Sequence, residues 1–123
     1  MAVAASYVEN GLAEFGSARL FAPPLMWSEA RSVLHQLVWR GAISVVDGTL
    51  SREWLESCGI ERAEPARMGV HAWKIADRLG WAKTYDAEYV ALADLLSCRL
   101  VTLDARLRRG AQRLGFVVGP DEL

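Results

Sequence analysis

The stretch TYDAEYVALADLLSCRLVTLDARLRRGAQRLGFVV, residues 84–118, decides the fold. Residues 86–96 predict a helix that is apolar on nearly every side, which is typical of a deeply packed helix. Residues 99–103 have the composition of a short strand. Ala105–Leu114 predicts a helix that Gly115 closes, and the apolar FVV after it predicts a last strand. This alternation of helices and short strands favours a parallel sheet that helices cover on both faces.

The same alternation extends to the N-terminus. Ala2–Ser6 predicts a short buried strand. The clearest helix has apolar residues at i, i+3, i+4, i+7 and i+8 over residues 30–38, with Ser28 as its expected N-cap. Further helices are predicted at residues 7–15, 47–59 and 70–79. The whole pattern therefore predicts an α/β protein.

Length and composition narrow the class of protein. A chain of 123 residues with 52% apolar residues suits one domain with a sizeable core. Its net charge of −1 gives no global attraction to nucleic acid, so such a partner would have to be held by a local patch. The start of the chain has no signal-peptide pattern, and no apolar run is long enough for a membrane span. We therefore expect a cytoplasmic protein that makes no membrane contact, with Cys58 and Cys98 as reduced, packed thiols.

Three acids are placed where predicted helices begin: Glu29 in MWSEAR, Asp86 in KTYDAEY and Asp104 in VTLDARL. Each alone fits the preference for acidic residues in the first turn of a helix. The carboxyl ends of parallel strands meet at one edge of a sheet, so the three carboxylates are expected to converge. Clustered carboxylates repel one another unless a cation bridges them, and hard oxygen ligands suit Mg²⁺ or Mn²⁺. The arrangement predicts metal-assisted phosphodiester hydrolysis.

The tandem motifs YDAEYVALA (85–93) and LVTLDARL (100–107), with APPLMWSEARSVL (22–34) before them, resemble the PIN-domain nucleases, and among these the VapC-type toxins of bacterial toxin–antitoxin pairs. The resemblance is loosest at residues 47–67. It implies a three-layer α/β/α fold with a mostly parallel central sheet of four or five short strands, in a single domain over residues 1–123. It also implies a type II toxin that hydrolyses RNA as an Mg²⁺- or Mn²⁺-dependent endoribonuclease, binds a cognate VapB-type antitoxin and forms a homodimer.

The resemblance also implies roles for particular residues. Ser6 and Thr102 match small hydroxyl positions beside the site. The first acid of the family closes strand one, and Ala4 stands at that position here. Three of the four metal-holding acids of the family are matched, namely Glu29, Asp86 and Asp104. Losing a residue that merely supports a metal ligand costs roughly 10–100-fold, and losing a ligand should cost at least as much. With alanine at position 4, the chain is therefore expected to be a feeble or inactive nuclease.

Three explanations of Ala4 stay open. It is a substitution that lets a toxic enzyme be produced, a natural loss, or a change offset by another acid, with Glu9 the nearest in sequence. If catalysis is lost, the alternative function is a PIN-fold binding module that sequesters an antitoxin or RNA. An unrelated α/β phosphotransfer domain would need an acid at the end of strand one and a phosphate-binding loop, and the sequence shows neither.

Basic and aromatic residues suggest partners. Arg106 and Arg109 follow Asp104 within two helical turns. Such arginines most often form a solvated helix face, but beside an acidic metal site they would neutralise RNA phosphates. The chain also has five tryptophans, most of them expected in the core or at interfaces. Trp39 falls on the polar side of its helix, which suits contact with a protein partner.

Overall fold

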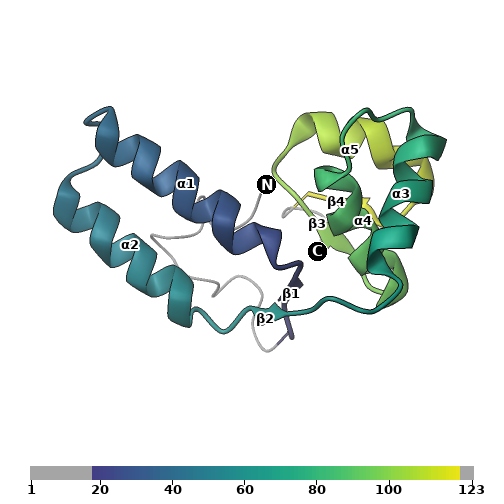
Figure 1. Cartoon of the computed structure of the whole chain (residues 1–123), viewed down its shortest axis with the longest axis horizontal. Helices are drawn as coiled ribbons and strands as arrows, with labels where there is room; N and C mark the ends of the chain where they lie inside the picture. Colours follow the sequence, from purple (N-terminus) through teal and green to yellow (C-terminus); the bar gives the residue numbers. More distant parts are fainter. Residues whose placement is uncertain (1–17, 120–123) are drawn as a thin grey trace.

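The computed structural model describes residues 18–119, which form helices joined by very short strands (Figure 1). The helices are α1 (Leu25–Trp39), α2 (Val45–Ser57), α3 (Met68–Leu79), α4 (Tyr85–Leu95) and α5 (Ala105–Ala111), which the 3₁₀ turn η2 (Gln112–Leu114) extends. The strands are β1 (Phe21–Ala22), β2 (Glu61–Arg62), β3 (Leu100–Val101) and β4 (Val117–Val118). The predicted strand Ala2–Ser6 and the predicted helix 7–15 lie outside the described residues.

The strands form two parallel pairs. In one pair Phe21 of β1 lies opposite Glu61 of β2, and in the other Leu100 of β3 lies opposite Val117 of β4. The predicted parallel pairing is therefore confirmed. Within residues 18–119 the strands are fewer and shorter than expected for one central sheet, and the two pairs do not join.

Helix α1 begins earlier than the sequence pattern indicated. Pro24 is its N-cap residue, and the N–H of Met26 donates to the carbonyl oxygen of Pro23 at 3.0 Å. Proline fixes φ near the helical value, so the two prolines start the helix at Leu25. The prediction of Ser28 as N-cap is wrong, because Ser28 lies exposed inside the helix. Glu29 consequently lies beyond the first turn of its helix, not at the junction itself.

Helices α1 and α2 pack side by side as a hairpin, on the left in Figure 1. Their shared core includes Trp27, Leu34 and Leu55, all at least nine-tenths buried. Gly48 of α2 is buried against Val38 of α1. The close approach of the two helices depends on the missing side chain at Gly48.

Helices α3 and α4 form the second and larger core, with α5 packed beside them. The predicted deep packing of α4 is confirmed, since six of its eleven residues are buried. The predicted stop of α3 is also confirmed, because Gly80 has the left-handed φ of 72° that favours glycine at a helix end. None of the helices within residues 18–119 has the length and apolar character that crossing a membrane requires.

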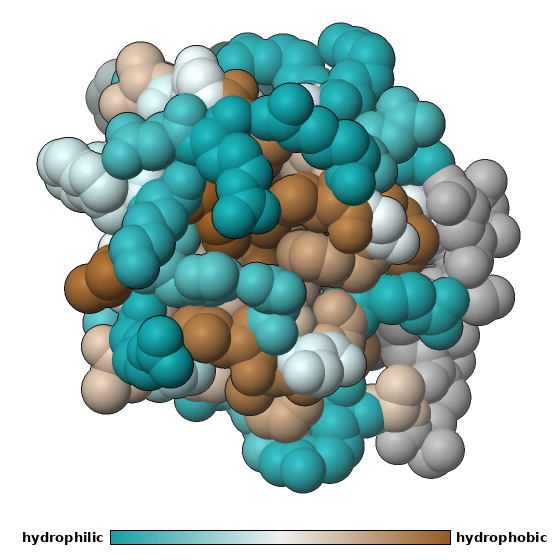
Figure 2. Space-filling view, turned by 90° about the vertical axis from the view of Figure 1, so that its right-hand side faces the viewer, coloured by the Kyte–Doolittle hydropathy of each residue, from teal (hydrophilic) through white to brown (hydrophobic). Residues whose placement is uncertain are grey.

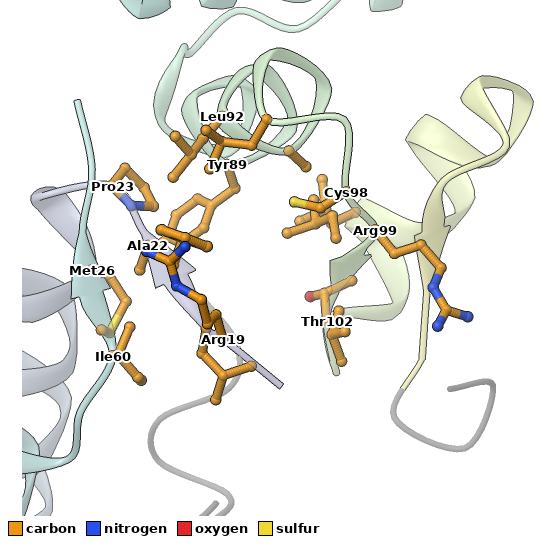
Figure 3. A pocket seen from close by; sticks show the side chains of 17 residues that line it. Arg19, Ala22, Pro23, Met26, Ile60, Tyr89, Leu92, Cys98, Arg99 and Thr102 are labelled. Atoms are coloured by element: carbon orange, nitrogen blue, oxygen red, sulfur yellow. The ribbon is translucent and has the colours of Figure 1, made fainter. Parts of the chain in front are cut away.

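An apolar groove runs between β1 and β3, the facing members of the two strand pairs (Figure 3). Ala22 and Met26 lie on one side of it, Thr102 lies on the other, and Leu92 of α4 lies at its top. Tyr89 also lines the groove. The groove thus includes Thr102, which lies just after β3 and two positions before Asp104.

Some large apolar side chains are exposed. Trp39 is 84% exposed at the end of α1, which confirms its predicted place on the polar side of the helix. Trp73, which the sequence did not single out, is 66% exposed on α3 beside exposed Val70. Figure 2 shows the end of the molecule that lies on the right in Figure 1, where apolar side chains gather at the centre and hydrophilic ones surround them.

Candidate metal and RNA site

Asp104 lies at the junction between β3 and α5 and is the N-cap of that helix. Its Oδ1 accepts from the backbone N–H of Arg106 at 2.9 Å and of Leu107 at 3.2 Å. The hydroxyl Oγ1 of Thr102, which is 1% exposed, accepts from the N–H of Asp104 at 3.0 Å. These bonds hold the Asp104 carboxylate at the carboxyl end of β3, as the junction argument predicted.

Glu29 projects from α1 towards α4. Its Oε1 accepts a hydrogen bond from the phenol of Tyr89 at 2.7 Å. Burial of Tyr89, followed by its bond to the Glu29 carboxylate, raises the pKa of this phenol far above its usual value. Tyr89 therefore stays protonated and remains the donor at physiological pH.

Glu29 and Asp86 line one solvent-open hollow, together with the cations Lys83 and Arg106. Leu107 lines the same hollow, and it shares with Arg106 the backbone bonds to Asp104. The structure thus gathers acids from α1 and α4 beside the start of α5. Two basic side chains stand next to these acids, which is the arrangement an anionic substrate requires.

Other predicted site residues lie elsewhere. Arg109 lines a separate hollow with Leu79 and Arg113, so of the two predicted arginines only Arg106 shares a hollow with the acids. Ala4 and Ser6 lie outside the described residues.

Comparison with known proteins identifies the family. Residues 3–112 match the PIN domain. The chain belongs to the PIN domain family. It is 36% identical over 89 residues to ribonuclease VapC9 of Mycobacterium tuberculosis and to a VapC ribonuclease of Mycobacterium bovis. In each case the alignment covers 72% of this chain and 68% of the relative. No solved structure matches the chain at a comparable level of significance.

Membership of the PIN family confirms the predicted fold class, because the PIN domain is a three-layer α/β/α fold. The matched range starts at residue 3, so it includes the position of Ala4. It ends at residue 112 and therefore also includes Glu29, Asp86 and Asp104. All four positions consequently lie inside the PIN domain.

The three predicted acids have the chemistry that a hard divalent cation requires, although only Glu29 and Asp86 line one hollow and Asp104 lies outside it. Glu29, Asp86 and Asp104 offer carboxylate oxygens, the ligands that Mg²⁺ and Mn²⁺ prefer. Burial, followed by the charges of Glu64 and Glu29, raises the pKa of Glu88, which follows Asp86 by two positions on α4. Within residues 18–119, however, no three acidic, histidine or cysteine side chains lie close enough together to hold a metal.

Sequence reasoning missed three residues of this PIN domain, of which Lys83 lines the hollow and Tyr89 bonds to Glu29. Tyr89 follows Asp86 by three positions, a spacing that puts both on one face of α4, so the helical pattern could have found it. Glu88 also sits in the first turn of α4. Lys83 belongs to the α3–α4 loop, and no pattern in the sequence marks it.

Proposed function

We propose that this PIN domain is the toxin of a type II toxin–antitoxin pair and a metal-dependent endoribonuclease that hydrolyses RNA phosphodiester bonds. The observation that carries the proposal is the single hollow in which Glu29 and Asp86 face Lys83 and Arg106. Acids that suit a cation and cations that suit phosphate thereby adjoin one another. The similarity to VapC ribonucleases supports this choice of reaction.

We propose Glu29, Asp86 and Asp104 as the residues that would hold Mg²⁺ or Mn²⁺. When bound, such an ion supplies an activated water and stabilises the leaving oxygen of a phosphodiester. The residues of the chain itself bind the RNA and orient the proposed metal ligands. Thr102 holds the backbone of Asp104, and Arg106 neutralises a phosphate of the RNA strand beside the acids.

We propose that Ala4 stands where the family places a fourth carboxylate, which impairs this chain. The PIN domain match begins at residue 3 and so includes Ala4, which supports this proposal. The same substitution favours the second candidate function, a non-catalytic module that sequesters an antitoxin or RNA.

The test of the nuclease is to restore the acid. The chain as written and its Ala4→Asp variant are incubated with total cellular RNA and Mn²⁺ or Mg²⁺, with a chelator in parallel. We expect the variant to cleave RNA at least about tenfold faster than the parent, because a missing metal ligand is supplied. The chelator should abolish the difference. Ala4→Asn is the control, because asparagine has the same shape as aspartate but carries no charge. A folded Ala4→Asp variant that binds RNA or antitoxin without cleaving would favour the binding module instead.

The basic residues provide a second test. Arg106→Ala is expected to weaken RNA binding severalfold and to reduce the salt dependence of binding by roughly one phosphate contact. Arg109→Ala is expected to have a smaller effect, because Arg109 lines a different hollow. Arg52→Ala, an exposed arginine of α2, is the matched control. Affinities measured by fluorescence anisotropy at several salt concentrations would check this order. If Arg106→Ala and Arg52→Ala lose the same amount of RNA affinity, Arg106 does not contribute to the RNA site.

We propose a VapB-type antitoxin as the protein partner, a homodimer as the assembly and the cytoplasm as the location. The exposed Trp39 and Trp73 support a protein partner, since tryptophan is enriched at interfaces. Cys58 and Cys98 are both free thiols, which is usual for cytosolic proteins. Cys58 is half-buried, whereas Cys98 is exposed, so the prediction that both are packed is wrong for Cys98.

A further inference from the structure

Tyr89 is a buried residue with a polar end at the candidate site. It is 8% exposed and belongs to the cluster formed by α1 and α2, together with Trp27 and Leu55. Its ring also lines the groove between β1 and β3 (Figure 3). Only the hydroxyl is used for a polar contact, and it reaches Oε1 of Glu29 at 2.7 Å. The ring is therefore fixed by packing, and the phenol is a rigid donor.

Glu29 needs such a donor because of where it stands. Its side chain is flexible, and Glu29 is neither the N-cap of α1 nor within its first turn, so no free helix N–H holds the carboxylate. Asp104, by contrast, is held by two backbone N–H groups. The hydrogen bond from a phenol to a carboxylate is charge-assisted and short, so it gives Glu29 the orientation that the cap gives Asp104.

The bond leaves the carboxylate able to bind a cation. A carboxylate offers about four lone-pair sites on two oxygens. Tyr89 uses one of them on Oε1, and the side chain of Glu29 also lines the hollow shared with Asp86. A phenol has a proton to donate and carries no charge. It can therefore orient the Glu29 carboxylate without adding a second charged group that would compete for the ion.

We propose that Tyr89 is a positioning residue that fixes the Glu29 carboxylate for a divalent cation. This inference rests on the proposed function, because it takes Glu29 as a metal ligand. Residues that orient metal ligands through a hydrogen bond typically contribute 10–100-fold to metal affinity or activity. Removal of the hydroxyl alone should therefore weaken cation binding while the packed ring keeps the fold.

The experiment measures Mn²⁺ affinity by calorimetry on the Ala4→Asp protein, with and without Tyr89→Phe. We expect Tyr89→Phe to raise the dissociation constant at least about tenfold. Ile75→Val, in the α3–α4 core, is the matched control for a mild loss of stability, and it should leave the Mn²⁺ affinity unchanged. In a Glu29→Gln background, Tyr89→Phe should have no additional effect, because the group that it orients is gone.

A metal-free crystal structure gives a second readout. With tyrosine at position 89, the Glu29 side chain should occupy one rotamer, and with phenylalanine it should occupy several. An unchanged dissociation constant in Tyr89→Phe, while the Ala4→Asp parent binds Mn²⁺ and cleaves RNA, would overturn this inference alone. A folded parent that neither binds Mn²⁺ nor cleaves RNA would overturn the proposed function and this inference with it.

Discussion

Asp104→Ala in the Ala4→Asp protein is expected to lower RNA cleavage at least about 100-fold and the free energy of unfolding by about 1 kcal/mol. Two separate causes act at one residue. The carboxylate is a proposed metal ligand, and the same side chain accepts two backbone N–H bonds at the start of α5. Alanine removes both contributions, so activity and stability should fall together.

Asp104→Asn separates the two causes. Asparagine caps helices about as well as aspartate, so the free energy of unfolding should stay close to that of the parent. The charge is lost, so cleavage should still fall close to the level of Asp104→Ala. Urea denaturation and initial cleavage rates, measured on the same preparations, check both statements. Full activity in Asp104→Asn would show that Asp104 acts only as a helix cap.

Much of the fold could be predicted because periodicity and end signals agree locally. The apolar α4 and the left-handed Gly80 after α3 are both read directly from the sequence. Ser28 failed as an N-cap because the fixed φ of Pro24 starts α1 one turn earlier. The predicted strands were longer than the observed ones, because residues of strand composition continue beyond those that pair. Strand β3, for example, ends at Val101, before Asp104 caps the next helix.

The candidate site was predictable to the extent that it follows from topology. Asp104 caps a helix after a strand, as the junction rule expects, whereas Asp86 lies in the first turn of α4, which follows α3 and not a strand. The contact between Glu29 and Tyr89 joins residues that are 60 positions apart in sequence. Such a contact depends on where the fold places α1 relative to α4, and no local pattern encodes that placement.

Gly48→Ala is expected to lower the free energy of unfolding by about 1–3 kcal/mol. A Cβ at this position would lie 2.3 Å from Cγ2 of Val38 on α1. Valine is stiff at χ1 in a helix, so its methyl group cannot turn away cheaply, and α1 and α2 must move apart. Alanine gains about 1 kcal/mol over glycine in intrinsic helix propensity, and that gain is too small to offset the clash. Thermal and urea denaturation would measure the loss.

Two further variants isolate the steric cause. Gly69→Ala in α3 adds the same methyl group where nothing lies within 4 Å, so it should be neutral or stabilising by up to about 1 kcal/mol. Val38→Ala removes the clashing methyl group, so Gly48→Ala should cost much less in that background. A double variant as unstable as the sum of the two single variants would show that Gly48 is not needed for the close approach of α1 and α2. Because Glu29 stands on α1, loosening this hairpin should also weaken RNA cleavage by the Ala4→Asp protein.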